Sequence, residues 1–193
     1  MANQNQLTLL KEGVQFFNSW RAINLWEMID LSGADLSGLN LSGANLSKAN
    51  LNDATFSGAS FSGANLSGAS LTSTQGDTLD LSGLDFSGAD LSNANFELVI
   101  LSNANLSNAN LTKTNLSNGA LDGANLNGTI ISGTNLSEVI MQGLDLSGRD
   151  LSGMDLSYSD LRSANLSNAN LTGAKLTGAQ LGGANLTGVI GYP

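Results

Sequence analysis

Histidine and cysteine are absent from the 193 residues of this chain, and proline occurs once. Without them the chain lacks the commonest general base, the soft-metal ligands and the thiol nucleophile, so carboxylates are the main groups left for acid–base chemistry. A disulfide scaffold is excluded as well, and a single proline excludes a collagen-like triple helix. We therefore expect a non-enzymatic protein that holds no metal and no cofactor.

Long apolar runs and an excess of basic residues are also missing. No run of about 18 apolar residues is present, so no transmembrane span is expected. The apolar residues near the start are dispersed, and no small-residue cleavage site follows a basic stretch, which argues against a signal peptide. The formal net charge is −9, which opposes direct nucleic-acid binding because that requires cationic side chains. These features favour a soluble, cytoplasmic protein.

What the chain does have is a period of five residues. From Leu31 to Leu186, every fifth residue is Leu, Phe, Ile or Met in 31 of 32 steps, and the exception is Gly76. With this residue taken as position three, position one is Ala 17 times and position two is Asp or Asn 22 times. Ser or Thr is usual at position four, and Gly or Asn at position five. An α-helix repeats its face every ~3.6 residues and would scatter these residues, so the period excludes a helix here.

The five positions fit short extended segments that are joined by bends. Extended backbone alternates sides, which places positions one and three in a shared interior and turns position two outward. Gly and Asn at position five tolerate the positive φ that a corner needs. Each pentapeptide therefore predicts one short side of a coil followed by a bend.

This pattern closely resembles that of the pentapeptide repeat family, in segments such as Ala34-Asp35-Leu36-Ser37-Gly38. The resemblance covers residues 29–190. It implies an all-β solenoid, a right-handed quadrilateral β-helix with four pentapeptides per coil, and hence about eight coils. Residues 191–193 drop the consensus and form a C-terminal tail.

Residues 1–28 differ from the repeats in composition and predict an amphipathic helix. An open solenoid end exposes unpaired backbone and a raw core, so we expect this helix to cap the first coil. A membrane-surface helix is the alternative, but the basic residues are balanced by acidic ones. The residues spaced three or four apart on its apolar face are Leu7, Leu10, Val14 and Phe17, and those that widen it are Phe16, Trp20, Ile23 and Trp26.

Two places depart from the consensus inside the repeats. In residues 72–78, around Gly76, neither the central Leu nor the small Ala appears, and we expect either a degenerate side or an outward loop. Arg149 occupies position one, where burial of an unpaired guanidinium is costly. We expect the wall to bulge there, so that Arg149 either escapes from the interior or forms an ion pair with Asp150 or Asp155, and a functional contact is the alternative.

Three outward positions, each four pentapeptides after the last, carry Ile100, Ala120 and Ile140 instead of Asp or Asn, and Leu98 lies at the corner before Ile100. On a four-sided coil they stack on one side. Contiguous exposed apolar patches usually mark association sites, so this set is the candidate protein-binding patch. Tolerated drift of the repeat, or a patch covered by the loop around Gly76, is the alternative.

The densest group of carboxylates does not predict a catalytic or metal site. Its members each occupy position two of successive steps, so on a four-sided coil they point away from four different sides. Convergence on one substrate or ion is therefore not expected. These residues are Asp145, Asp150, Asp155 and Asp160.

The sequence favours a protein-binding or regulatory module whose protein partner it does not identify. Self-association as a homodimer, through the C-terminal end or through the apolar patch, is a further expectation. The family resemblance adds one alternative, because some members imitate duplex DNA and inhibit DNA gyrase. Ice binding is a third hypothesis, but position four is mostly Ser rather than the regular ranks of Thr expected for it.

Overall fold

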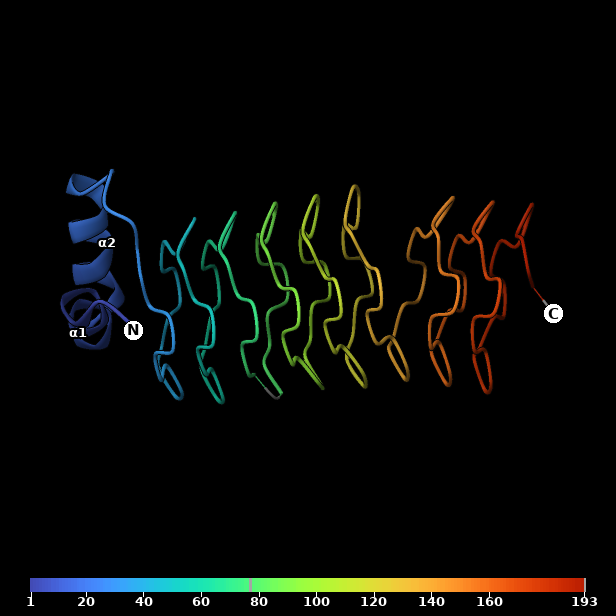
Figure 1. Ribbon diagram of the computed structural model, residues 1–193, viewed down its shortest axis with the longest axis horizontal. Helices are drawn as coiled ribbons and strands as arrows, with labels where there is room; N and C mark the ends of the chain where they lie inside the picture. Colours follow the sequence, from blue (N-terminus) through green and yellow to red (C-terminus); the bar gives the residue numbers. More distant parts are fainter. Residues whose placement is uncertain (77, 193) are drawn as a thin grey trace.

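The computed structural model describes residues 1–76 and 78–192. Two helices lie at one end, α1 (Gln4–Glu12) and α2 (Val14–Ile23), and a solenoid extends from them to the C-terminal end (Figure 1). The chain termini therefore lie at opposite ends of an elongated molecule (Figure 1).

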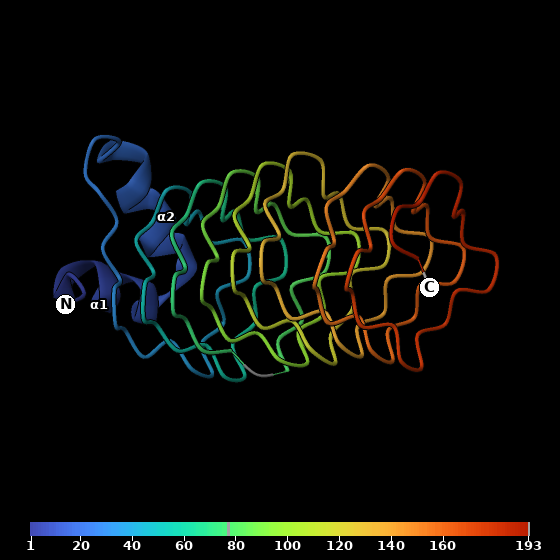
Figure 2. The ribbon, with the colours of Figure 1, turned by 45° about the vertical axis from the view of Figure 1, so that its right-hand side comes forward.

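The coils of the solenoid are held by parallel bridges that join each bridge residue to its equivalent in the next coil, such as Asp30 with Asn50. Bridge residues follow one another at every fifth position, so each coil has four sides (Figure 2). We name these the Asp30, Asp35, Asn40 and Asn45 sides after their first bridge residues. Each side contributes one bridge residue and a two-residue turn, so the described residues contain no longer strand. The predicted quadrilateral β-helix is confirmed.

Positions one and three fill the interior, as their alternation with position two predicts. Leu106 and Ala109, for example, are fully buried. Position five adopts positive φ at the corners, near 68° at Gly38 and 60° at Asn118. Gly and Asn reach this left-handed region at least cost, which explains their frequency at position five.

The step at Gly76 keeps the register of its neighbours. Gln75 bridges to the coils on both sides of it, and the Gly76 N–H donates to the carbonyl of Asn95 at 3.1 Å. Leu79, at the following position one, occupies the space that the missing side chain leaves, together with a phenylalanine from each adjacent coil, Phe56 and Phe96. Residues 72–76 therefore keep the path of the coil, as a degenerate side would, and residue 77 of the predicted stretch lies outside the described residues.

The N-terminal helices cap the first coil with both apolar and polar contacts. Leu10 and Phe17 are buried, and Val14 and Trp20 pack against the same core. The buried Gln6 side chain accepts from the Asp30 N–H at 2.8 Å and donates to a backbone carbonyl at 2.9 Å. These bonds replace the ladder partners that a preceding coil would have supplied, so the predicted cap is confirmed.

Asn18 on α2 plays the same part on another side of the first coil. Its amide donates to the carbonyl of Gly43 at 2.9 Å, and its side-chain oxygen accepts from the N–H of Asn45 at 2.9 Å. Together Gln6 and Asn18 pair backbone groups on two of the four sides.

The cap differs from the prediction in two respects. It is two helices, because Gly13 has φ 147° and separates α1 from α2. The expectation that Phe16, Ile23 and Trp26 widen the buried face is wrong, since all three are exposed and Trp26 is 98% exposed. The turn at Gly13 directs Leu10 and Phe17 at the core, and a single straight helix would have needed a wider apolar face.

The ladder is interrupted once on three sides together. In the part of the chain that the structure describes, residues 125, 130 and 135 form no bridges to residues 145, 150 and 155, whereas Ala120, Ile140 and Asp160 remain bridged on the Asn40 side. Figure 1 shows the wider spacing between these two coils, where the chain passes from yellow to orange. We call this discontinuity the break.

Arg149 lies in the break and does not form the expected ion pair. Its guanidinium Nη1 donates to the backbone carbonyl of Thr129 at 2.7 Å. The prediction of a pair with Asp150 or Asp155 is wrong, because the guanidinium donates instead to the Thr129 carbonyl, which has no backbone donor in the described chain, and to the Leu126 carbonyl, which also accepts from the Thr129 N–H. Asp155 pairs with Lys175 at 3.2 Å.

Candidate functional site

The Asn40 side carries a row of apolar side chains that face outward. Ile100, Ala120 and Ile140 are successive bridge residues, so they stack directly on one another. Ile100 is 41% exposed, Ile140 is 45% exposed and Ala120 is half-buried. With Leu98, which is 45% exposed at the corner, they form what we call the apolar stripe. The structure thus brings together the four residues of the candidate patch, and no described loop covers it.

The Asn45 side shows what the consensus does when it is kept. All its bridge residues are Asp or Asn, and at four of the seven steps along this side an amide donates to the carboxylate or amide oxygen of the preceding coil, at distances of 3.0–3.2 Å. In the apolar stripe, apolar side chains replace Asp and Asn at the bridge positions, so these stabilising side-chain hydrogen bonds are not formed. The residues of the Asn45 side are Asn45, Asn65, Asp85, Asn105, Asn125, Asp145, Asn165 and Asn185.

The corner that precedes the stripe is also unusual. Leu98 has φ 63°, a left-handed conformation that costs a non-glycine residue roughly 1–2 kcal/mol. Its side chain recovers little of this through burial because it is nearly half exposed. The same row of corners holds Glu138 and Tyr158, both at positive φ, where Gly or Asn is usual. The positive φ itself belongs to the corners of the solenoid in general, since Lys48 and Lys113 share it, and what sets Leu98 apart is its exposed apolar side chain.

A carboxylate bounds the stripe at each end. Asp80 bridges to Ile100, and Asp160 bridges to Ile140. The Ser82 hydroxyl and N–H donate to Asp80 Oδ1 at 2.6 and 3.0 Å, and these bonds hold the pKa of Asp80 below its ordinary value. Asp80 is therefore ionised at neutral pH, and within the described residues no cation pairs with it.

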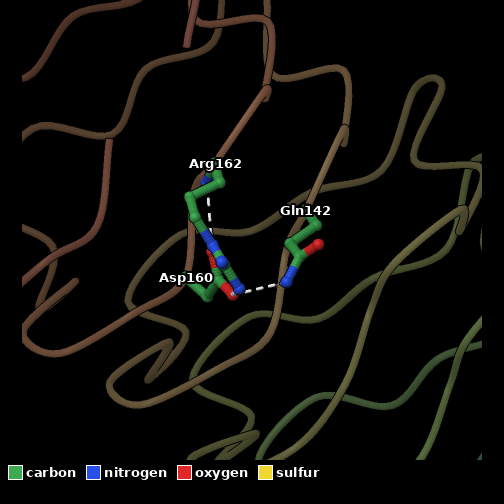
Figure 3. A network of polar contacts seen from close by, with 3 residues as sticks. All are labelled: Gln142, Asp160 and Arg162. Carbon is green, nitrogen blue, oxygen red and sulfur yellow. Dashed lines mark hydrogen bonds and ion pairs between the residues drawn. The ribbon is translucent and has the colours of Figure 1, made fainter. Parts of the chain in front are cut away.

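Asp160, at the other end, lies in a closed polar network (Figure 3). Arg162 donates Nε to Asp160 Oδ1 at 2.8 Å and Nη2 to Oδ2 at 2.6 Å, and Gln142 donates to Oδ2 at 2.6 Å. The Arg162 bonds, followed by that of Gln142, keep the pKa of Asp160 well below its ordinary value although burial acts against this. The two ends thus differ, because the charge of Asp160 is neutralised and that of Asp80 is not.

A cleft opens on the same side next to Asp80. Ser60 and Asp80 are not bridged in the described chain, and a cavity of about 500 Å³ lies between their coils. It is lined by small polar residues, among them Ser62 and Ser82. Sequence reasoning missed this cleft and the place of Asp80 and Asp160 at the ends of the stripe. Leu79 at position one is no signal of the cleft, because Leu39 and Leu84 occupy the same position beside bridges that are kept.

The densest group of carboxylates is spread around the solenoid. Asp145, Asp150, Asp155 and Asp160 lie on four different sides, as their spacing predicts. Among the residues that the structure describes, no three carboxylates converge on a position that could hold a metal ion. Neither helix within the described ranges is long and apolar enough to cross a membrane.

The repeats match the model of a known protein family. The family model for pentapeptide repeats matches eight copies, over residues 29–68, 80–118, 120–157 and 150–188. No curated protein sequence matches the chain. None of the matches indicates a catalytic family.

Solved structures with the same fold include two cyanobacterial proteins. HetL from Nostoc sp. strain PCC 7120, a pentapeptide repeat protein involved in heterocyst differentiation regulation, is 26% identical, with a TM-score of 0.60 over 89% of this chain and 94% of HetL. Rfr23 from Cyanothece 51142 is 27% identical, with a TM-score of 0.54 over 64% of this chain and 97% of Rfr23. QnrB1, a plasmid-mediated fluoroquinolone resistance protein, is 22% identical, with a TM-score of 0.51 over 81% of this chain and 91% of QnrB1, a likeness of fold alone.

Proposed function

Because this chain belongs to the pentapeptide repeat family, we propose that it is a non-enzymatic module that binds another protein through the apolar stripe. One observation carries the proposal: three stacked outward positions hold Ile100, Ala120 and Ile140, with the exposed side chain of Leu98 beside them. A contiguous exposed apolar surface of this kind is typical of an association site, because a partner that covers it removes hydrocarbon from water.

The surroundings of the stripe suggest the chemistry of the partner. From Asp80 to Asp160 the row spans four coil spacings, which is roughly 19 Å at about 4.8 Å per spacing. This fits the apolar centre of an interface with a polar rim. The free carboxylate of Asp80 favours a Lys or Arg of the partner at that end, whereas Asp160 is already paired with Arg162.

Similarity to HetL supports a regulatory role exerted through protein contacts. That protein is involved in regulation of differentiation, and its fold covers most of this chain. We extend to this chain only the general idea, that a pentapeptide repeat solenoid without catalytic groups regulates by occupying a surface of another protein.

The alternative of a DNA-mimicking gyrase inhibitor has less support. The nine Asp residues at position two are spread over all four sides, three on the Asp30 side and two on each of the others. A duplex carries one charge per roughly 1.7 Å, so a solenoid with a net charge of −9 imitates it weakly. Supercoiling by gyrase should stay unchanged across a micromolar titration of this protein.

Partner capture from source-cell lysate tests the proposal. The wild type is compared with an Ile100→Asp/Ile140→Asp variant, and with Asn105→Asp/Asn125→Asp as a control that adds the same charge to another side. We expect mass spectrometry to find a protein retained by the wild type and the control but not by the stripe variant. Retention by all three would remove the stripe as the binding surface, and retention of topoisomerase subunits would favour the alternative.

Self-association through the stripe is resolved by the same variants. Sedimentation velocity of the three purified proteins would show a dimer that only the stripe variant loses. In that outcome the partner is a second copy of this chain.

A further inference from the structure

We infer that the break is a hinge, which divides the solenoid into two blocks that bend about the Asn40 side. The inference does not depend on the proposed binding function. On the Asn45 and Asp30 sides no backbone bond crosses the break in the described chain, and on the Asp35 side one remains, from the Glu138 N–H to the Ser157 carbonyl at 2.8 Å, at the corner next to the Asn40 side. On the Asn40 side the Ile140 N–H donates to Gly119 and the Met141 N–H to Asp160, both at 2.9 Å. One bridged side beside three sides without bridges is the geometry of a hinge.

The cause lies in the residues at position one of the coil that follows the break. On the Asn45, Asp30 and Asp35 sides these are Leu144, Arg149 and Met154, where Ala is usual, and on the Asn40 side the residue is Ser159. The three sides with large residues are those whose bridges are missing, and the side with Ser keeps its bridge. These three sides keep their bridges to the following coil, so the large side chains open the solenoid only toward the preceding coil, which Arg149 contacts.

Two consecutive large residues at position one, Leu79 and Leu84, do not have this effect. The missing bridge between residues 60 and 80 lies beside Leu79, but residues 55, 65 and 70 remain bridged to 75, 85 and 90. That interruption is therefore spanned on three sides and cannot bend. The break differs because only one side spans it.

Arg149 acts as a clasp across the break. Its guanidinium donates to the carbonyls of Thr129 and Leu126. In a closed coil the Thr129 carbonyl would accept a backbone N–H of the following coil, and the Leu126 carbonyl would lie next to that ladder. Burial lowers the pKa of Arg149, yet guanidinium groups stay protonated in proteins, so these are charge-assisted bonds. These two bonds from one flexible side chain take the place of the several backbone bonds that would cross the break if its three open sides were closed.

The open side forms a cleft of about 480 Å³ around Arg149. Its lips are residues 127–132 and 147–150, which are mostly small or polar. In the described structure the N–H groups of Gly128 and Ile131 donate to no backbone carbonyl, although the equivalent groups two coils earlier do so at 2.8–2.9 Å. In the described chain these N–H groups thus line the cleft without a backbone partner, and the Arg149 side chain is what joins the two lips.

Hydrogen exchange tests whether the break exists. We expect the amides of Gly128 and Ile131 to exchange at least about 100-fold faster than those of Gly88 and Leu91, which occupy the same positions two coils earlier and are bonded. Equal protection of the two sets would show a continuous ladder and overturn the inference.

Disulfide trapping tests whether the break moves. The chain contains no cysteine, so pairs can be placed without background. Ser132→Cys/Ser152→Cys spans the break, and Ser87→Cys/Ser107→Cys spans two bonded coils as a control. A disulfide needs Cα atoms about 4.4–6.8 Å apart, which bonded coils provide at about 4.8 Å.

We expect the pair across the break to oxidise at least about tenfold more slowly than the control pair, but to completion. Replacement of Leu144, Arg149 and Met154 by Ala should bring its rate to that of the control, and Arg149→Ala alone should raise the rate if the triple variant fails to fold. A pair that oxidises as fast as the control would show that no break exists. A pair that never oxidises would show a rigid opening, and either result overturns the hinge.

Discussion

Restoring the consensus at Gly76 should destabilise the protein unless Leu79 is shortened at the same time. A Cβ built on Gly76 would lie 2.5 Å from Leu79 Cδ1 and 3.3 Å from the Phe96 ring. The apolar volume missing at position three has thus moved to the following position one. Gly76→Leu should therefore overpack the core even though Leu is the consensus residue.

The magnitudes follow from the packing. Gly76→Leu adds a side chain to a filled site and should lower the free energy of unfolding by about 1–3 kcal/mol. Leu79→Ala removes a buried side chain, 2% exposed, and should lower it by about 2–5 kcal/mol. The double variant conserves volume and should lose less than about 1.5 kcal/mol. The two changes should therefore couple by at least about 1.5 kcal/mol.

Urea unfolding followed by circular dichroism measures all four corners of this cycle. A control moves the arrangement to a regular step, as Leu101→Gly/Ala104→Leu, where the stacked neighbours in the two adjacent coils are Leu81 and Leu121 rather than Phe. This variant should stay destabilised by more than about 2 kcal/mol, since no aromatic rings reach into the space. Additive losses in the Gly76 cycle would refute the compensation.

Three other variants test the cap, the corner and the carboxylate network. Gln6→Met should lower the free energy of unfolding by about 1–3 kcal/mol for each backbone group left unpaired, whereas the exposed Gln4→Met should change it little, as thermal unfolding would show. Leu98→Gly should raise the free energy of unfolding by up to about 1–2 kcal/mol because it relieves the left-handed strain, and it should weaken partner capture. A variant that loses both stability and partner capture would assign Leu98 a purely structural role. Because the pKa of folded Asp160 is depressed, its contribution is present above the unfolded pKa and is lost as the pH falls below about 4. Asp160→Asn should therefore flatten the acid limb of the stability curve, and an unchanged limb would contradict the network.

The period of five predicts the solenoid because one rule governs every step. Leu106 and Ala109 are buried and Asn105 is turned outward for the same reason as their equivalents in each coil, so local alternation extends to the whole fold. The stacking of Ile100, Ala120 and Ile140 follows from counting residues once four sides per coil are accepted.

The departures depend on how several steps act together, which one step does not reveal. Arg149 alone suggests an ion pair with a neighbouring Asp, and only the adjacent Leu144 and Met154 explain why backbone carbonyls become available to it. Gly76 leaves a degenerate side and a loop both open until Leu79 is seen to fill its space. The bend at Gly13 was likewise missed, because the apolar spacing of residues 7–17 continues through it without a change of phase.

The register of four pentapeptides per coil has a consequence for how this chain tolerates insertions. Duplication of a whole coil would leave each side intact and would lengthen a row such as the one that contains Asp160. Duplication of one pentapeptide would preserve the local pattern just as well, but it would turn every later coil by a quarter of a revolution. An insertion between Ile100 and Ile140 would then separate Asp160 from the surface it now bounds, while burial at every step remained normal. Duplication of a single pentapeptide by gene slippage would thus change the surface of the solenoid without changing its core.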